Sequence, residues 1–154
     1  MSTPAKSRVQ VLPPTVTFEQ SWQFPAALQS EVAAYACQFY QPFWGQFTFH
    51  GNQRTATLPP FAGSAVITET LVEQTATGNS YTLVGLPGIT DYVGSFELTP
   101  QRGGKHVRLR WRVRCRYQST DALTVVAQVF AGGSGLMTTA LQQQFDAQPA
   151  AHPV

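Results

Sequence analysis

The sequence predicts a single α+β domain in which a curved antiparallel sheet packs against a long C-terminal helix. Segments of alternating polar and apolar residues follow one another between residues 53 and 117, separated by turns, which is typical of consecutive strands. Residues 120–145 then carry apolar side chains at helical spacing. A strand run with helices segregated from it is an α+β layout. With 154 residues, the chain fits one domain, assigned to residues 1–146, with residues 147–154 as a disordered tail.

Composition limits the classes of partner. Charged residues make up 12% of the chain, against about 25% in an ordinary soluble domain. The net charge of +2 is too small to predict nucleic-acid binding. No run approaches the roughly 18 apolar residues of a membrane span, and residues 1–10 lack the apolar core of a signal peptide. Cys37 and Cys115 lack C-x-x-C spacing, so we expect buried free thiols and a cytoplasmic protein.

The N-terminal segment predicts a strand and then a helix. Residues 15–24 alternate, with Gln20 the one polar residue on the apolar face, which predicts a half-buried strand. Pro25 opens a helix predicted over residues 26–39, because its missing N–H is harmless at a helix start. Pro42 ends that helix, and an aromatic cluster on a short helix or turn follows at Phe43, Trp44 and Phe47.

Further strands are predicted over residues 53–58, 64–74, 80–84, 90–99 and 105–117. In the last of these, the even positions from Arg108 to Arg116 are all arginine, and the odd positions are largely apolar. The strand period of two therefore puts five guanidinium groups on one face, about 6.8 Å apart. We favour a solvated outer face with acidic neighbours such as Glu97, because no aromatic residue shares that face for base stacking. An anion or nucleic-acid surface is the alternative.

The C-terminal helix is predicted over residues 120–145, with Thr120 and Asp121 at its start. Three glycines, Gly132, Gly133 and Gly135, interrupt it. Each mid-helix glycine costs about 1 kcal/mol relative to alanine. They therefore predict a kink, or the close approach of another backbone or a ligand.

Four motifs occur in order along the predicted sheet: Arg54-Thr-Ala-Thr-Leu-Pro59, Ile67-Thr-Glu-Thr-Leu71, Tyr81-Thr-Leu83 and Leu86-Pro-Gly-Ile-Thr-Asp-Tyr92. Phe130 and Gly135-Leu-Met-Thr-Thr-Ala-Leu141 follow in the last helix. The ordered set resembles the bacterial polyketide cyclase/dehydrase-type proteins of the START-like (SRPBCC) superfamily. The plant abscisic acid receptors share the same pieces. The resemblance runs from about residue 15 to residue 145 and departs from the family after Pro25, where the frequent Trp is missing, and at Gly132 and Gly133.

The resemblance implies a helix-grip fold, in which a curved seven-stranded antiparallel sheet wraps a long C-terminal helix and encloses an internal cavity. Members bind lipids, hormones and polyketides, and some catalyse cyclisation or dehydration. We therefore expect a hydrophobic small-molecule partner, no cofactor, no nucleic acid, and a monomer or homodimer. Two loops, residues 58–62 and 86–89, would act as gate and latch of the cavity; the alternative is two ordinary turns.

Glu69 is the most informative carboxylate. It shares a strand face with Ile67 and Leu71, and a charge on a buried face needs a partner or a shifted pKa. Arg54 in the preceding strand is the obvious partner. Three interpretations stay open: a structural Glu–Arg pair, an anchor for a polar ligand group, or a general acid–base with Arg54 and Tyr92 as the other catalytic candidates.

The predicted ligand-binding residues are those expected on inner faces, at the loops and on the C-terminal helix. They are Trp22, Leu58, Pro59, Phe61, Ile67, Tyr81, Leu83, Leu86, Pro87, Ile89, Phe96, Trp111, Phe130, Ser134 and Thr138. Core packing is the alternative for the tyrosines. His50, His106 and His152 are scattered, so no metal site is predicted. Three functions remain: a carrier or sensor of an apolar ligand, a cofactor-independent cyclase or dehydratase, and an interaction module using the arginine face.

Overall fold

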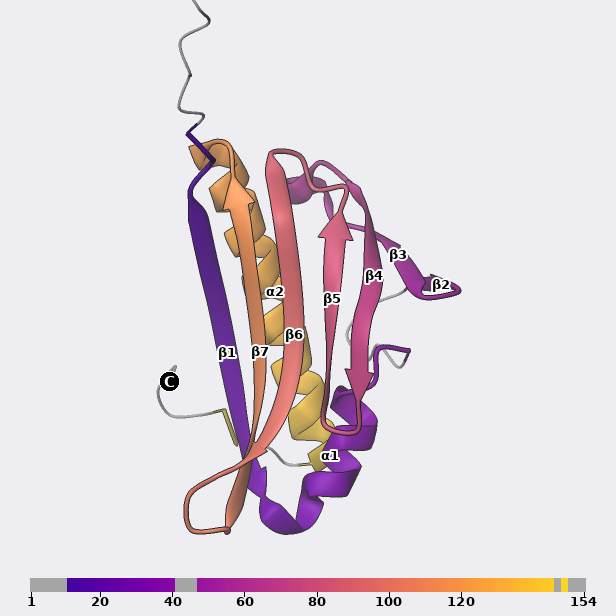
Figure 1. Ribbon diagram of the computed structural model, residues 1–154, viewed down its shortest axis with the longest axis vertical. Coiled ribbons are helices and arrows are strands. Elements are labelled where there is room, and N and C mark those ends of the chain that lie inside the picture. The colour runs from indigo at the N-terminus through magenta and orange to yellow at the C-terminus, as the bar shows by residue number, and fades with distance from the viewer. Residues whose placement is uncertain (1–10, 41–46, 146–147, 150–154) are drawn as a thin grey trace, which may run out of the picture.

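The computed structural model describes residues 11–40, 47–145 and 148–149. In it one antiparallel sheet has the strand order β2-β3-β4-β5-β6-β7-β1-β8. The long helix α2 (Thr120–Phe145) lies along one face of this curved sheet, and the short helix α1 (Gln29–Ala36) covers one end (Figure 1). The strands are β1 (Thr15–Pro25), β2 (Thr48–His50), β3 (Gln53–Thr57), β4 (Val66–Thr75), β5 (Gly78–Val84), β6 (Ile89–Pro100), β7 (His106–Tyr117) and β8 (Gln148–Pro149). The predicted α+β helix-grip arrangement is confirmed, with β1 to β7 as its seven strands.

Helix α1 is shorter than predicted. It ends at Ala36 instead of residue 39, after a 3-10 turn over Ala26–Leu28. Side chains from the sheet take over the backbone groups that a longer helix would use. The Gln74 and Asn79 amides both donate to the Cys37 carbonyl, at 2.8 and 2.9 Å, and the Phe39 N–H donates to Gln74 Oε1 at 3.0 Å. Phe43 and Trp44 of the predicted aromatic cluster lie outside the described residues.

Two residues of the tail predicted to be disordered form a strand. β8 pairs with Trp22 and Gln23 of β1, on the side of β1 opposite β7. The prediction was wrong for these two residues. Residues 150–154 lie outside the described part of the chain.

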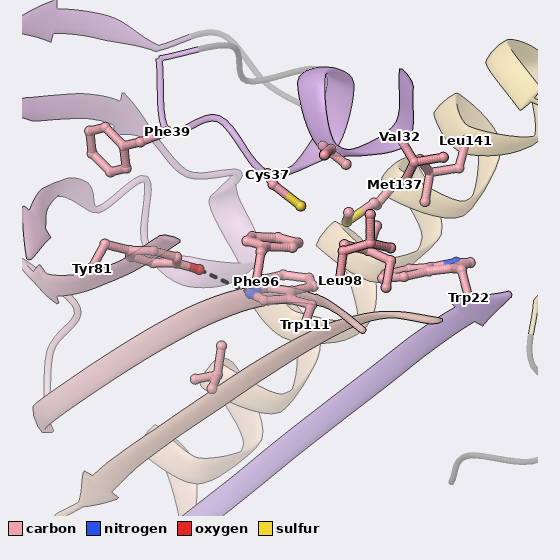
Figure 2. Close-up of a cluster of buried hydrophobic side chains, with 14 of the residues drawn as sticks. Trp22, Val32, Cys37, Phe39, Tyr81, Phe96, Leu98, Trp111, Met137 and Leu141 are labelled. Atoms are coloured by element: carbon pink, nitrogen blue, oxygen red, sulfur yellow. Dashed lines mark hydrogen bonds between the residues drawn. The ribbon is translucent and has the colours of Figure 1, made fainter. Parts of the chain in front are cut away.

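The core lies between the inner face of the sheet and α2 (Figure 2). Trp22, Val107 and Leu109 of the sheet are almost fully buried against Met137 and Leu141 of α2. Each such side chain contributes about 1.5–3 kcal/mol through burial. The Trp22 indole N–H donates to Thr138 Oγ1 at 2.9 Å, which fixes α2 on β1.

Within the described residues, α2 is the one helix long and apolar enough, by length and composition, to cross a membrane, with a mean hydropathy of 1.3. Its Val126, Met137 and Leu141 are buried in the core. This position is that of the core helix in a helix-grip fold.

The glycines of α2 differ in whether the surrounding structure requires a residue without a side chain. A Cβ on Gly133 would lie 2.8 Å from Cη2 of Trp111, whereas a Cβ on Gly132 or Gly135 would meet nothing within 4 Å. The group that approaches Gly133 is therefore an indole side chain, and not the backbone or ligand that was predicted. The structure offers no packing reason for Gly135.

Candidate functional site

A cavity of about 320 Å³ opens between α2 and the sheet. That volume is at the lower end of the roughly 300–1,000 Å³ typical of small-molecule sites. The lining comes from both layers and is largely apolar: Phe47, Ala56, Thr57, Leu58, Pro59, Phe61, Ile67, Glu69, Leu83, Tyr92, Trp111, Val129, Phe130, Gly132, Gly133 and Leu136. The space can hold a small apolar molecule.

Half of the predicted site residues line this cavity: Leu58, Pro59, Phe61, Ile67, Glu69, Leu83, Tyr92, Trp111 and Phe130. Those on the sheet, such as Ile67, Leu83 and Trp111, are buried residues of its inner face. Leu58, Pro59 and Phe61 belong to the first predicted loop, which forms part of the rim. Strand alternation and the first proline loop are therefore sufficient to locate this wall.

The other predicted residues do not line the cavity: Arg54, Trp22, Tyr81, Leu86, Pro87, Ile89, Phe96, Ser134 and Thr138. Arg54 and Tyr81 lie behind its wall, bonded to Glu69 and Trp111. Phe96 stacks on Trp111, and Trp22 bonds to Thr138 in the filled part of the core. Pro87 borders a separate depression together with Phe61 and Asp121.

Several lining residues were not among the predicted ligand-binding residues, although a ligand was one of the groups expected to approach the helix glycines. On α2 they are Val129, Gly132, Gly133 and Leu136. Their spacing of i, i+3, i+4 and i+7 marks one helix face, and this signal was available in the sequence. Ala56 lies two residues after Arg54 on β3 and therefore on the same strand face, which also identifies it. Thr57 and Phe47 carry no comparable sequence signal.

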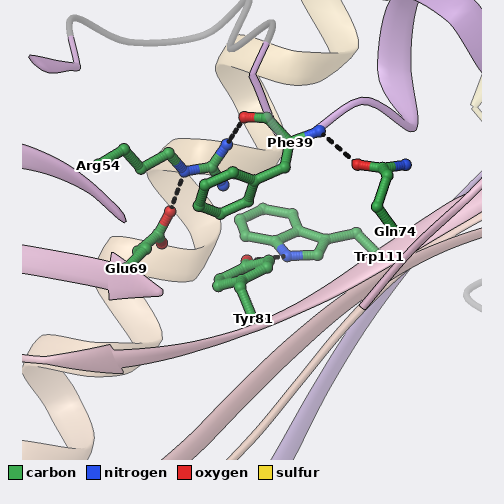
Figure 3. A network of polar contacts seen from close by, with 6 residues as sticks. All are labelled: Phe39, Arg54, Glu69, Gln74, Tyr81 and Trp111. Carbon is green, nitrogen blue, oxygen red and sulfur yellow. Dashed lines mark hydrogen bonds and ion pairs between the residues drawn. The ribbon is translucent and has the colours of Figure 1, made fainter. Parts of the chain in front are cut away.

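A buried ion pair joins β3 and β4 at the cavity wall (Figure 3). Arg54 and Glu69 are directly opposite in the register, with Arg54 Nε 2.6 Å from Glu69 Oε1. Arg54 Nη1 also donates to the Phe39 carbonyl at 2.6 Å, and its guanidinium lies 4.1 Å from the Phe39 ring centroid. The predicted Glu–Arg contact is confirmed, and the pair holds the segment after α1 against the sheet.

Glu69 is 5% exposed, and it is the one carboxylate among the cavity residues. Burial raises the pKa of Glu69 above its ordinary value, while the charge of Arg54 and its hydrogen bond oppose that rise. The only hydrogen bond to this carboxylate from the described residues involves Oε1. The carboxylate can therefore accept a hydrogen bond from a molecule in the cavity.

Tyr81, Tyr92 and Trp111 form a second polar group inside the wall. The Trp111 N–H donates to the Tyr81 hydroxyl at 2.9 Å, and Tyr81 also bonds to Tyr92. Burial is the main cause that raises the pKa of both tyrosines, and neighbouring groups that include Glu69 add to the rise. Both side chains therefore remain neutral phenols. Trp111 is stacked between Phe96, with ring centroids 5.4 Å apart, and Phe130 at 4.4 Å. These contacts fix one wall of the cavity in place.

No group of three His, Cys, Asp or Glu side chains among the described residues could hold a metal ion. His50 and His106 are exposed and lie on different strands, β2 and β7. His152 is outside the described residues. The absence of a metal or cofactor from the protein stays a prediction.

No family model matches the sequence, and no curated protein matches it either. Solved structures do. An uncharacterised protein from Bacillus thuringiensis aligns at a TM-score of 0.63 and 15% identity, over 86% of this chain and 98% of that one. The Zhui aromatase/cyclase of a Streptomyces species aligns at 0.59 and 13%, over 86% and 94%.

Norcoclaurine synthase from Thalictrum flavum, solved with dopamine and hydroxybenzaldehyde, aligns at a TM-score of 0.64 and 12% identity, over 94% of each chain. At these identities the likeness shows the fold alone. It establishes that this chain has the helix-grip fold of those proteins over most of its length.

Proposed function

We propose that the protein binds a small, largely apolar molecule in the cavity between α2 and the sheet. The observation that carries this proposal is an apolar cavity with one buried carboxylate, Glu69, in its wall. Such sites combine an apolar lining with few polar groups that fix orientation. Proteins of the same fold include an aromatase/cyclase and a synthase solved with two aromatic compounds.

The lining favours an aromatic or polyketide-like ligand over a lipid. Phe47, Phe61, Tyr92, Trp111 and Phe130 supply most of its large side chains, and aromatic rings pack well against one another. Arg54 already neutralises Glu69. A ligand hydroxyl, which donates a hydrogen bond without bringing an uncompensated charge, therefore suits Glu69 better than a cation.

A second candidate function is cofactor-independent cyclisation or dehydration of that ligand. The raised pKa of Glu69 favours it, because burial makes the carboxylate a stronger base than an exposed one. In a dehydration, Glu69 would take a proton from a carbon next to a carbonyl and return it to the departing hydroxyl, which leaves as water. A carrier or sensor would use the same residue only as an anchor.

Filling the cavity tests the binding proposal. Ala56→Phe places a ring in the cavity space, and we expect it to abolish the fluorescence enhancement of 1-anilinonaphthalene-8-sulfonate, with a melting temperature that stays within a few degrees. Val84→Phe is the matched control, because Val84 is 64% exposed and lies outside the cavity. Equal dye binding by Ala56→Phe and Val84→Phe would refute the site.

Glu69→Gln separates catalysis from binding. The ligand is first identified by native mass spectrometry of the protein from its own source. If Glu69 moves a proton, turnover of the ligand should fall at least about a hundredfold in Glu69→Gln. Ligand affinity should fall only about tenfold, because the Gln side-chain oxygen can still accept a neutral hydrogen bond. Glu97→Gln on the opposite sheet face is the control. Undiminished turnover by Glu69→Gln would rule out the acid–base role.

We also place the protein in the cytoplasm. Cys37 and Cys115 are both buried free thiols, and burial raises the pKa of Cys37 to about 12, so it stays protonated. This state suits a reducing compartment.

A further inference from the structure

The outer face of the sheet carries a row of five arginines on β7, on the side opposite the cavity. Three acidic residues contact two of these arginines, Arg110 and Arg116. Arg110 Nε lies 3.3 Å from Glu19 Oε1, and its Nη2 lies 3.8 Å from Glu97 Oε1. Arg116 Nε lies 3.3 Å from Asp91 Oδ2. The expected acidic neighbours are confirmed, and they compensate the charges of Arg110 and Arg116.

The part of the row between Arg110 and Arg116 has no such compensation. Arg112 and Arg114 are exposed, and neither forms an ion pair with any residue in the described part of the chain. The register places Glu19 opposite Arg112, yet the Glu19 carboxylate contacts Arg110 instead. Two adjacent guanidinium groups, spaced about 6.8 Å apart by the strand period, therefore face solvent side by side.

These two arginines border a groove of about 490 Å³ on the outer face. Ser95 and Val93 of β6, directly opposite Arg112 and Arg114, also line it, and Val93 is 46% exposed. Arg116 and its partner Asp91 close one end. The groove thus combines two unpaired cations with a hydroxyl group and an apolar side chain.

We propose that this groove binds the phosphate group of a small organic phosphate. Two guanidinium groups can each donate paired hydrogen bonds to a tetrahedral oxyanion, and the Ser95 hydroxyl can add another. Val93 gives the carbon body of the ligand an apolar contact. A nucleic-acid strand laid along the row would instead meet Glu19 and Glu97 beside Arg110, and Asp91 beside Arg116. The charge pattern therefore fits one phosphate group better than a chain of them.

Titration with phenyl phosphate, followed through the Arg Nε–Hε signals in NMR spectra, tests the proposal. We expect saturable binding, and an affinity about tenfold or more lower in the double variant Arg112→Ser/Arg114→Ser, which loses two charged donors. Arg102→Ser/Lys105→Ser is the matched control, because it removes the same charge from exposed positions at the β6–β7 turn. Circular dichroism checks that both variants fold.

Four outcomes decide the matter. Absence of saturation, or an equal loss in both double variants, would overturn the site. Inorganic phosphate that binds as tightly as phenyl phosphate would overturn the role of Val93, and tighter binding of a single-stranded oligonucleotide would replace the small ligand with nucleic acid. Ala56→Phe should bind phenyl phosphate normally, which keeps this test independent of the cavity.

Discussion

Replacing Arg54 with methionine is expected to lower the free energy of unfolding by about 3–5 kcal/mol, the cost of breaking a buried ion pair from one side. Both partners are buried, with Arg54 2% and Glu69 5% exposed. Without Arg54, the Glu69 carboxylate has no opposing charge within hydrogen-bond reach in the described structure, and the Phe39 carbonyl loses its 2.6 Å hydrogen bond. Urea-induced unfolding measures the change.

The loss should depend on pH. Burial raises the pKa of Glu69, and without Arg54 nothing comparable opposes that rise. A carboxyl group whose pKa is higher in the folded than in the unfolded protein adds stability at low pH and loses it as pH rises. The defect of Arg54→Met is therefore expected to be largest at pH 7 and to shrink as pH falls towards 4.5, the ordinary pKa of glutamate.

The double variant Arg54→Met/Glu69→Met is the control for this prediction. It removes both charges, and replacing a buried ion pair with apolar residues of similar size is often neutral or stabilising. It should therefore be more stable than Arg54→Met alone and lose the pH dependence. A double variant as unstable as the single one would mean that Arg54 acts mainly through Phe39 and packing.

Replacing Gly94 with alanine is expected to cost about 3 kcal/mol, the upper part of the range for overpacked cores. A Cβ on this β6 glycine would overlap the Cζ and hydroxyl oxygen of Tyr81 and lie 2.6 Å from its Cε2. Tyr81 is fully buried and cannot turn away easily. Its displacement would also break the bond from Trp111, so the tryptophan fluorescence of the folded protein should change.

Gly135→Ala is the matched control for Gly94→Ala. A Cβ at Gly135 meets nothing within 4 Å, and alanine favours the helix. We expect a gain of about 0.5–1 kcal/mol and unchanged fluorescence. If Gly94→Ala is as stable as the unchanged protein, the sheet can shift at this point, and the wall formed by Tyr81 and Trp111 is softer than its contacts indicate.

Strand alternation made both faces of β7 predictable. Its arginines and its apolar residues fall on opposite sides because successive side chains of a strand must, whatever the surroundings. The pairing of Arg54 with Glu69 followed from the same rule, since each is a charged residue on the inner face of adjacent strands. Helix termination did not follow, because Gln74 and Asn79, which bind the backbone after α1, lie about 40 residues away in the sequence.

The features of the cavity likewise fall into those that the sequence determined and those that only the tertiary structure decided. The sequence by itself determined which side chains face inward, including Glu69, Tyr81, Phe96 and Trp111, because that property is local to each strand. Only the tertiary structure decided which of these side chains border empty space. Tyr81 and Phe96 are covered by Trp111, whereas Glu69 and Trp111 are left open beside Gly132 and Gly133. That outcome depends on how closely α2 approaches the sheet, which is set by packing between residues far apart in the chain.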